Sequence, residues 1–121
     1  MPDSPPVTIF HNPGCSKSRG ALAILEQRSV DHRVVDYLAT PPSRDQLDSI
    51  VALLVDPVPE LVRRTDARFA ELGLDPSDYQ DAESIIELLL AHPELMQRPI
   101  VVSGTRAVIA RPSERVELLL P

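Results

Sequence analysis

The chemistry of this chain centres on Cys15, the single cysteine among its 121 residues. A tight turn marked by Pro13 and Gly14 precedes it, and a helical pattern begins directly after it. A thiol at a helix N-terminus faces unpaired backbone N–H groups and the positive end of the helix dipole, which both stabilise a thiolate. The sequence therefore favours a reactive thiol over the buried structural thiol that a lone cysteine most often is.

Positive charges flank this cysteine. Lys17 and Arg19 follow it within a short distance, and His11 adds a further charge when it is protonated. The N–H groups at a helix N-terminus also bind oxyanions. We therefore expect the loop to hold a negatively charged ligand against an activated sulfur.

The elements that position this loop form a predicted strand–helix–strand unit. The apolar run at residues 7–11 is typical of a buried strand, residues 16 to about 28 have a helical pattern, and residues 33–37 are typical of a second strand. These elements within roughly thirty residues predict a βαβ unit with parallel strands. Residues 1–6 are polar and rich in proline, so we expect a disordered lead-in rather than a signal sequence.

The stretch from about residue 43 to 95 is expected to be a helical insertion. Ser43 and Gln46 have the spacing of a capping box, which predicts a helix start. Further helices are predicted at residues 60–64, 67–72 and 81–90.

Arg63 and Arg64 fall outside any strong apolar period. Their spacing alone favours a solvated basic corner at the end of a helix, where cations are stabilised, over an oxyanion contact.

The end of the chain predicts a hairpin followed by a short helix. Pro99 cannot pair inside a central strand, so it should stand at the start of a strand that continues through Val102. Ser103 and Gly104 suggest a two-residue turn, residues 105–110 a returning strand, and residues from 111 a final helix. The complete order is βαβ, helical insertion, ββα. It indicates an α/β, thioredoxin-like fold with a four-stranded mixed sheet.

Composition limits the function classes. A chain of 121 residues with 43% hydrophobic residues supports one domain, here residues 7–121, and a net charge of −6 argues against nucleic-acid binding. One cysteine allows no internal disulfide, and no Cys/His cluster has metal-ligand spacing, so no bound metal or cofactor is expected. No apolar run approaches membrane-spanning length, so we expect a cytoplasmic monomer with no membrane contact.

Over residues 7–120 the sequence resembles a known family, the glutaredoxin-linked arsenate reductases of the ArsC type. The resemblance is carried by the order and spacing of five segments: His11-Asn12-Pro13-Gly14-Cys15-Ser16-Lys17-Ser18-Arg19, Tyr37 through Pro42 with Ser43-Arg44, Glu71-Leu72-Gly73-Leu74, Arg98-Pro99-Ile100-Val101-Val102 and Arg111-Pro112-Ser113-Glu114. It implies reduction of arsenate to arsenite through a covalent bond between cysteine and arsenate.

The resemblance also implies roles for individual residues. Cys15 would be the nucleophile, supported by His11 and Ser18. The arsenic oxyanion would be held by three arginines, Arg63, Arg98 and Arg111, with Arg64 an equally available alternative to the first. Supporting positions in the same motifs are Asn12, Arg19 and Pro99, and the bond before Pro99 is implied to be cis.

A single cysteine cannot resolve such an intermediate alone, so the resemblance implies an external thiol, glutathione followed by glutaredoxin, as co-substrate. Three other hypotheses remain. One is a thiol-transfer enzyme acting on mixed disulfides of low-molecular-weight thiols, and another is an inactive relative. The third is a regulator like the Spx proteins, which bind RNA polymerase and carry a C-x-x-C switch; here Ser18 occupies the second cysteine's position.

Overall fold

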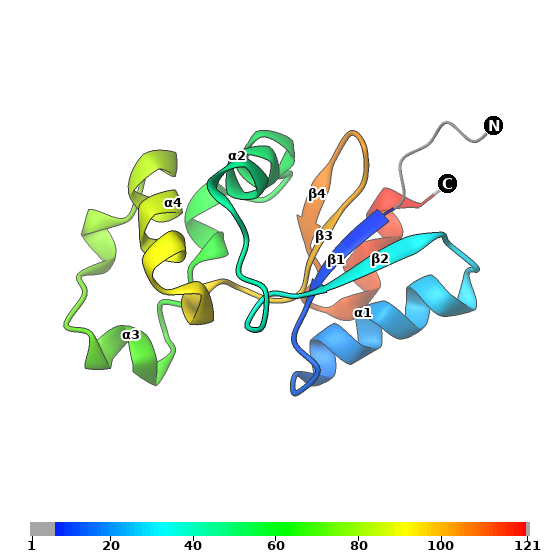
Figure 1. Cartoon of the computed structure of the whole chain (residues 1–121), viewed down its shortest axis with the longest axis horizontal. Helices are drawn as coiled ribbons and strands as arrows, with labels where there is room; N and C mark the ends of the chain where they lie inside the picture. The colour runs from blue at the N-terminus through cyan, green and yellow to red at the C-terminus, as the bar shows by residue number, and fades with distance from the viewer. Residues whose placement is uncertain (1–6, 121) are drawn as a thin grey trace.

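A four-stranded mixed sheet forms the framework of residues 7–120, the part of the chain that the computed structural model describes (Figure 1). The expected disordered lead-in, residues 1–6, lies outside it. The strands are β1 (Val7–His11), β2 (His32–Asp36), β3 (Ile100–Val102) and β4 (Ala107–Ile109), in the order β2-β1-β3-β4. β1 pairs with β2 in parallel and with β3 antiparallel, and β3 pairs with β4 antiparallel. The predicted α/β, thioredoxin-like sheet is therefore confirmed.

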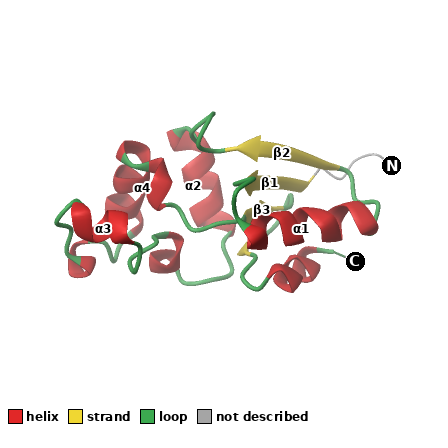
Figure 2. Ribbon diagram, turned by 90° about the horizontal axis from the view of Figure 1, so that it is seen from below, coloured by secondary structure: helices red, strands yellow, loops and turns green. Residues whose placement is uncertain are grey.

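One face of the sheet is covered by α1 (Ser16–Gln27) and by the 3₁₀ helix η4 (Ser113–Leu119), which lie side by side (Figure 2). Their apolar residues and the facing strand residues form one core, made up of Val7, Ile9, Ala21, Leu25, Val101, Val108, Ala110 and Val116. Gly20 lets the two helices approach closely, because a Cβ atom there would lie 2.5 Å from the Ser113 Oγ.

The helical insertion lies at the carboxyl ends of β1 and β2, which both point toward it (Figure 2). It contains α2 (Arg44–Leu53), η1 (Val58–Leu61), α3 (Ala67–Glu71), η2 (Pro76–Asp78), α4 (Ala82–Ala91) and η3 (Pro93–Leu95). The predicted capping box of Ser43 and Gln46 starts α2. The core of the insertion is continuous with the second face of the sheet, since one buried cluster contains Leu61 and Leu89 together with Phe10 and Ile100.

Two local predictions were wrong. The helix expected at residues 60–64 is a 3₁₀ helix that ends at Leu61, because Val62 instead forms a bridge with Met96 and the Arg63 N–H donates to the Leu95 carbonyl at 2.8 Å. These contacts hold Arg63 against the segment that leads into β3.

The hairpin between β3 and β4 also differs from its prediction. The Ser103 N–H donates to the Arg106 carbonyl at 2.8 Å, and the Ser103 hydroxyl accepts from the Arg106 N–H at 3.2 Å. The two residues at the tip of the turn are therefore Gly104 and Thr105 rather than Ser103 and Gly104, and β4 begins at Ala107 rather than at Thr105. In addition, β2 begins and ends one residue earlier than predicted, which leaves Tyr37 beyond the strand.

Within residues 7–120, no helix is both long enough and apolar enough to cross a membrane.

Candidate active site

Cys15 occupies the N-cap of α1, immediately after the loop that leaves β1. Asn12 closes this loop twice: its carbonyl accepts from the Cys15 N–H at 2.9 Å, and its Oδ1 accepts from the Gly14 N–H at 2.9 Å. The buried Ser18 hydroxyl accepts from the Asn12 N–H at 3.3 Å. Polar side chains thus fix the turn that presents the sulfur at the helix start, as predicted.

Two arginines from the other half of the fold reach this sulfur. The Arg98 side chain lies close enough to the sulfur to lower the pKa of the thiol, and the Arg111 Nη1 lies 3.9 Å from it. Arg98 stands just before β3 and Arg111 just after β4, so the antiparallel pair brings both to the end of the sheet at which β1 leads into Cys15. The Arg111 guanidinium also donates to the Arg98 carbonyl at 3.0 Å, which links the two residues.

The peptide bonds before Pro99 and Pro112 are both cis. The first was implied by the family resemblance and is confirmed. The second was not expected. Pro99 is buried, and its carbonyl accepts from the Ala110 N–H at 3.0 Å, which joins the beginning of β3 to the end of β4.

These surroundings determine the ionisation of Cys15. Burial alone would raise the pKa of the thiol, but the N–H of Ser18, the Arg98 side chain and the N–H of Lys17 outweigh it and lower the pKa to about 7. A large fraction of the sulfur is therefore thiolate at neutral pH, and the thiolate is the nucleophilic form.

The charges expected next to the cysteine act differently from the prediction. Lys17 contributes through its backbone N–H rather than its ammonium group. The Arg19 guanidinium donates to the Pro13 carbonyl at 2.7 Å, which braces the loop. His11 is buried, and this burial lowers the pKa of its imidazole despite the opposing charge of Asp36, so His11 is largely neutral at pH 7. Arg98 supplies the positive charge at the sulfur instead.

Tyr37 is a site residue that sequence reasoning missed. It is fully buried directly after β2, near Arg98 and Asn12, and its hydroxyl has no hydrogen-bond partner among residues 7–120. Burial raises the pKa of the phenol, which therefore stays protonated and can donate to a ligand. A hydroxyl directly after the carboxyl end of a parallel strand is the signal that could have identified it, because ligands bind there.

Several buried polar atoms of the candidate site residues have no hydrogen-bond partner within residues 7–120. The His11 Nδ1, the Tyr37 hydroxyl and the Arg98 Nε all lack a partner within the described residues. An unsatisfied buried polar group costs about 1–3 kcal/mol, so atoms of this kind are best explained by a ligand that completes them. An oxyanion only accepts hydrogen bonds, so it is complementary to the donors in this set, the Tyr37 hydroxyl and the Arg98 Nε.

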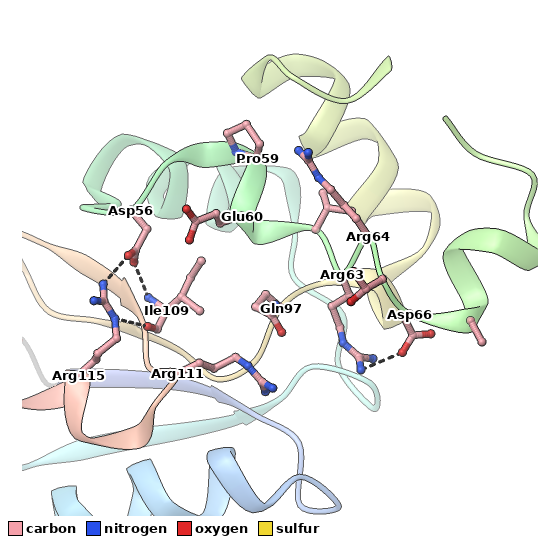
Figure 3. A pocket seen from close by; sticks show the side chains of 13 residues that line it. Asp56, Pro59, Glu60, Arg63, Arg64, Asp66, Gln97, Ile109, Arg111 and Arg115 are labelled. Atoms are coloured by element: carbon pink, nitrogen blue, oxygen red, sulfur yellow. Dashed lines mark hydrogen bonds and ion pairs between the residues drawn. The ribbon is translucent and has the colours of Figure 1, made fainter. Parts of the chain in front are cut away.

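The third arginine comes from the helical insertion. Arg63 is half-buried, pairs with Asp66 at 2.8 Å and lies within electrostatic reach of Arg98 and Arg111, whose charges, together with burial, lower the pKa of its guanidinium. The solvated corner expected from spacing was therefore wrong for this residue, because the bridge at Val62 turns it inward. Arg64 instead donates to the Tyr79 carbonyl at 3.1 Å and points away from Arg63 (Figure 3).

An open pocket of about 670 Å³ is lined by Arg63 and Arg111, two of these three arginines. Arg63 and Arg111 extend toward the same part of it (Figure 3). Its remaining lining is mostly polar and includes Asp56, Glu60, Arg64, Gln97 and Arg115. No group of three or more His, Cys, Asp or Glu side chains is arranged to hold a metal within the part of the chain that the structure describes.

Comparison with known proteins assigns the family. Residues 10–119 match the model of the ArsC family. The chain belongs to the ArsC family. An arsenate reductase from Neisseria meningitidis serogroup A is 40% identical over 117 residues, which cover 96% of this chain and 99% of that protein. One from Escherichia coli is 39% identical over 115 residues, which cover 95% of this chain and 81% of that protein.

Solved structures agree with this ArsC assignment. The arsenate reductase from Vibrio cholerae superposes with a TM-score of 0.83 at 37% identity, covering 94% of this chain and 97% of that one. An ArsC-related protein from Bacteroides fragilis has a TM-score of 0.77 at 20% identity, which shows the shared fold alone. The family resemblance drawn from the sequence is therefore confirmed.

Proposed function

We propose that this ArsC-family chain is an arsenate reductase that converts arsenate to arsenite through a covalent intermediate on Cys15. The observation that carries the proposal is a thiol whose pKa is lowered to about 7, in part by the Arg98 side chain, and which lies 3.9 Å from the Arg111 guanidinium. A nucleophile and oxyanion-binding cations therefore share one site. The names of the relatives, which are arsenate reductases, point the same way.

In the proposed reaction, Arg63, Arg98 and Arg111 bind the arsenate oxygens. Guanidinium groups stay charged at neutral pH and can donate to two oxygens at once, so they offset the repulsion between the thiolate and an anionic substrate. The Cys15 thiolate attacks arsenic, an S–As bond forms, and one oxygen leaves as water after protonation. Arsenic remains As(V) in this step, which is nucleophilic catalysis with electrostatic stabilisation.

Reduction then requires an external thiol, since Cys15 is the one cysteine in the chain. A glutathione thiolate attacks the Cys15 sulfur, the S–As bond breaks, and its electron pair stays on arsenic, which becomes As(III) and leaves as arsenite. The mixed disulfide on Cys15 is reduced by a second thiol, which we propose is glutaredoxin. The sum is arsenate plus two thiols giving arsenite, a disulfide and water, catalysed by a cytoplasmic monomer.

We further propose supporting roles for four loop residues. Ser18 and Asn12 keep the turn closed, and Arg19 braces it at the Pro13 carbonyl. Neutral His11 ends β1, and its unpartnered Nδ1 is the atom that we propose meets a substrate oxygen or its proton.

The decisive experiment measures arsenate-dependent oxidation of glutathione with glutaredoxin supplied. We expect turnover by the wild type and none by Cys15→Ser, with both proteins equally folded. Arg98→Ala should weaken arsenate binding strongly and Arg64→Ala only slightly. Comparable increases in the KM for arsenate in the two arginine variants would contradict the assignment of the oxyanion site.

A thiol-transfer enzyme is the second candidate, because a thiol of pKa about 7 also attacks mixed disulfides. The arginines separate the two functions. For an arsenate reductase, the Arg63→Ala, Arg98→Ala and Arg111→Ala variants should lose arsenate turnover while Cys15 still reacts with alkylating agents. If thiol transfer is instead fast in the wild type and arsenate turnover is absent, the second candidate replaces the first.

A further inference from the structure

The pocket beside the arginines contains charges that the fold leaves unmatched. Asp56 pairs with Arg115, and Asp66 pairs with Arg63. Glu60, in contrast, forms no hydrogen bond or ion pair through its carboxylate with any residue from 7 to 120.

Arg64 lines the same pocket, and its guanidinium contacts only the Tyr79 carbonyl, a neutral group. Its Nε is buried and has no partner within the described residues. Glu60 and Arg64 are four residues apart, a spacing that would let them pair on an α-helix. The 3₁₀ helix ends at Leu61, however, and no ion pair joins them. The Glu60 carboxylate and the Arg64 guanidinium therefore line a single pocket, and neither has an oppositely charged partner among the described residues.

A free carboxylate and a free guanidinium are complementary to an amino-acid zwitterion, whose ammonium donates and whose carboxylate accepts. The third charged group without an acidic partner, Arg111, marks the opposite side of the pocket and stands 3.9 Å from the Cys15 sulfur. A ligand with its zwitterionic head at Glu60 and Arg64 would have to extend past Arg111 to bring another group to the sulfur, because Cys15 itself does not line the pocket. A volume of about 670 Å³ is within the usual range for small-molecule sites.

We propose that this pocket binds the external thiol as a γ-glutamyl peptide of the glutathione type, with Glu60 accepting from its ammonium and Arg64 donating to its α-carboxylate. The inference rests on the proposed function, because it is the reduction of the Cys15 intermediate that requires a thiol from outside the chain. It assigns substrate selection to two residues that do not touch the sulfur.

The test uses a reaction that does not involve arsenate. The Cys15 thiolate attacks one sulfur of glutathione disulfide, the S–S bond breaks, a Cys15–glutathione disulfide forms, and one glutathione leaves as a thiolate that takes a proton from water. The rate is followed by mass spectrometry of the intact protein. Bis(2-hydroxyethyl) disulfide, which carries no charges, reports the reactivity of the sulfur itself.

Glu60→Gln should react with glutathione disulfide about 2- to 5-fold more slowly than the wild type, the size expected for one exposed ion pair. Its rate with bis(2-hydroxyethyl) disulfide should not change. The direction is diagnostic, since removing a negative charge would otherwise speed the approach of an anionic disulfide. Glu26→Gln, which removes an exposed carboxylate at the far end of α1, is the matched control and should behave as wild type in both reactions.

N-acetylglutathione supplies a second comparison, because acetylation removes the ammonium alone. In the arsenate assay the wild type should have a lower KM for glutathione than for N-acetylglutathione, and Glu60→Gln should abolish that preference without changing the KM for arsenate. Equal rates of Glu60→Gln and wild type with glutathione disulfide would overturn the inference. A Glu60-dependent rate in a protein without arsenate turnover would support the inference and refute the proposed function.

Discussion

At the scale of single residues, the activity depends on how an acidic chain keeps a cysteine ionised. The Cys15 thiol has a pKa of about 7 although burial opposes ionisation, because Arg98 and two backbone N–H groups stabilise the thiolate. Removing one of these contributions should move the titration in a defined direction.

The rate of Cys15 alkylation by iodoacetamide should rise with pH about a midpoint near 7 in the wild type. Arg98→Ala removes a cationic side chain that stabilises the thiolate, so its midpoint should move upward, toward the ordinary thiol value. Arg33→Ala removes an exposed arginine of β2 and should leave the midpoint unchanged. An unchanged midpoint in Arg98→Ala would assign the low pKa to the helix N-terminus alone.

The sequence was sufficient for the residues whose chemistry is tied to a local motif. Cys15 at a predicted helix start and Arg98 before a strand-opening proline could be named without a structure. The neutral state of His11 could not, since it follows from burial by residues distant in sequence. Tyr37 was missed for the same reason, because a tyrosine at a strand end is distinguished only by the absence of a hydrogen-bond partner.

At the scale of elements, the position of the active-site helix depends on its contact with η4. The Ser113 hydroxyl donates to the Lys17 carbonyl at 2.8 Å, and Gly20 provides the space for this contact. Element boundaries were predicted well where a local cap fixes them, as at Ser43. They were wrong where a long-range pairing competes, as where Val62 bridges to Met96.

Gly20→Ala should lower the free energy of unfolding by about 1–3 kcal/mol, the usual cost of overpacking. Helix propensity alone predicts the opposite sign, since Ala is about 1 kcal/mol better than Gly inside a helix. The added Cβ would lie 2.5 Å from the Ser113 Oγ and 3.1 Å from its Cβ, so η4 must shift. Urea denaturation measures the change, and the Gly20→Ala, Ser113→Gly double variant should recover most of it. A stabilised Gly20→Ala protein would show that the contact does not constrain α1.

At the scale of the whole molecule, the sheet has a core on each face, and the helical insertion belongs to one of them. Phe10, Ile100 and Ile109 of the strands are buried together with Leu89 of α4. Arg63 comes from this insertion, whereas Cys15 comes from the other half, so the site is complete only when both halves are packed. The shared cluster implies that they unfold as one cooperative unit.

Leu89→Ala tests this cooperativity. Leu89 is 1% exposed, so its truncation should lower the free energy of unfolding by about 2–5 kcal/mol. The adjacent Leu90 is 40% exposed, and Leu90→Ala should cost less than about 1 kcal/mol. Far-UV circular dichroism, which is weighted toward helices, and the loss of the lowered pKa of Cys15, read from its alkylation rate at pH 7, should shift by the same denaturant concentration in Leu89→Ala. If the helical signal were lost first while Cys15 kept its folded-state reactivity, the insertion would be an independent unit. Arg63, which the insertion contributes, would then be attached to the rest of the site by a mobile segment. The continuous core that joins Leu89 to the strands would not fix its position.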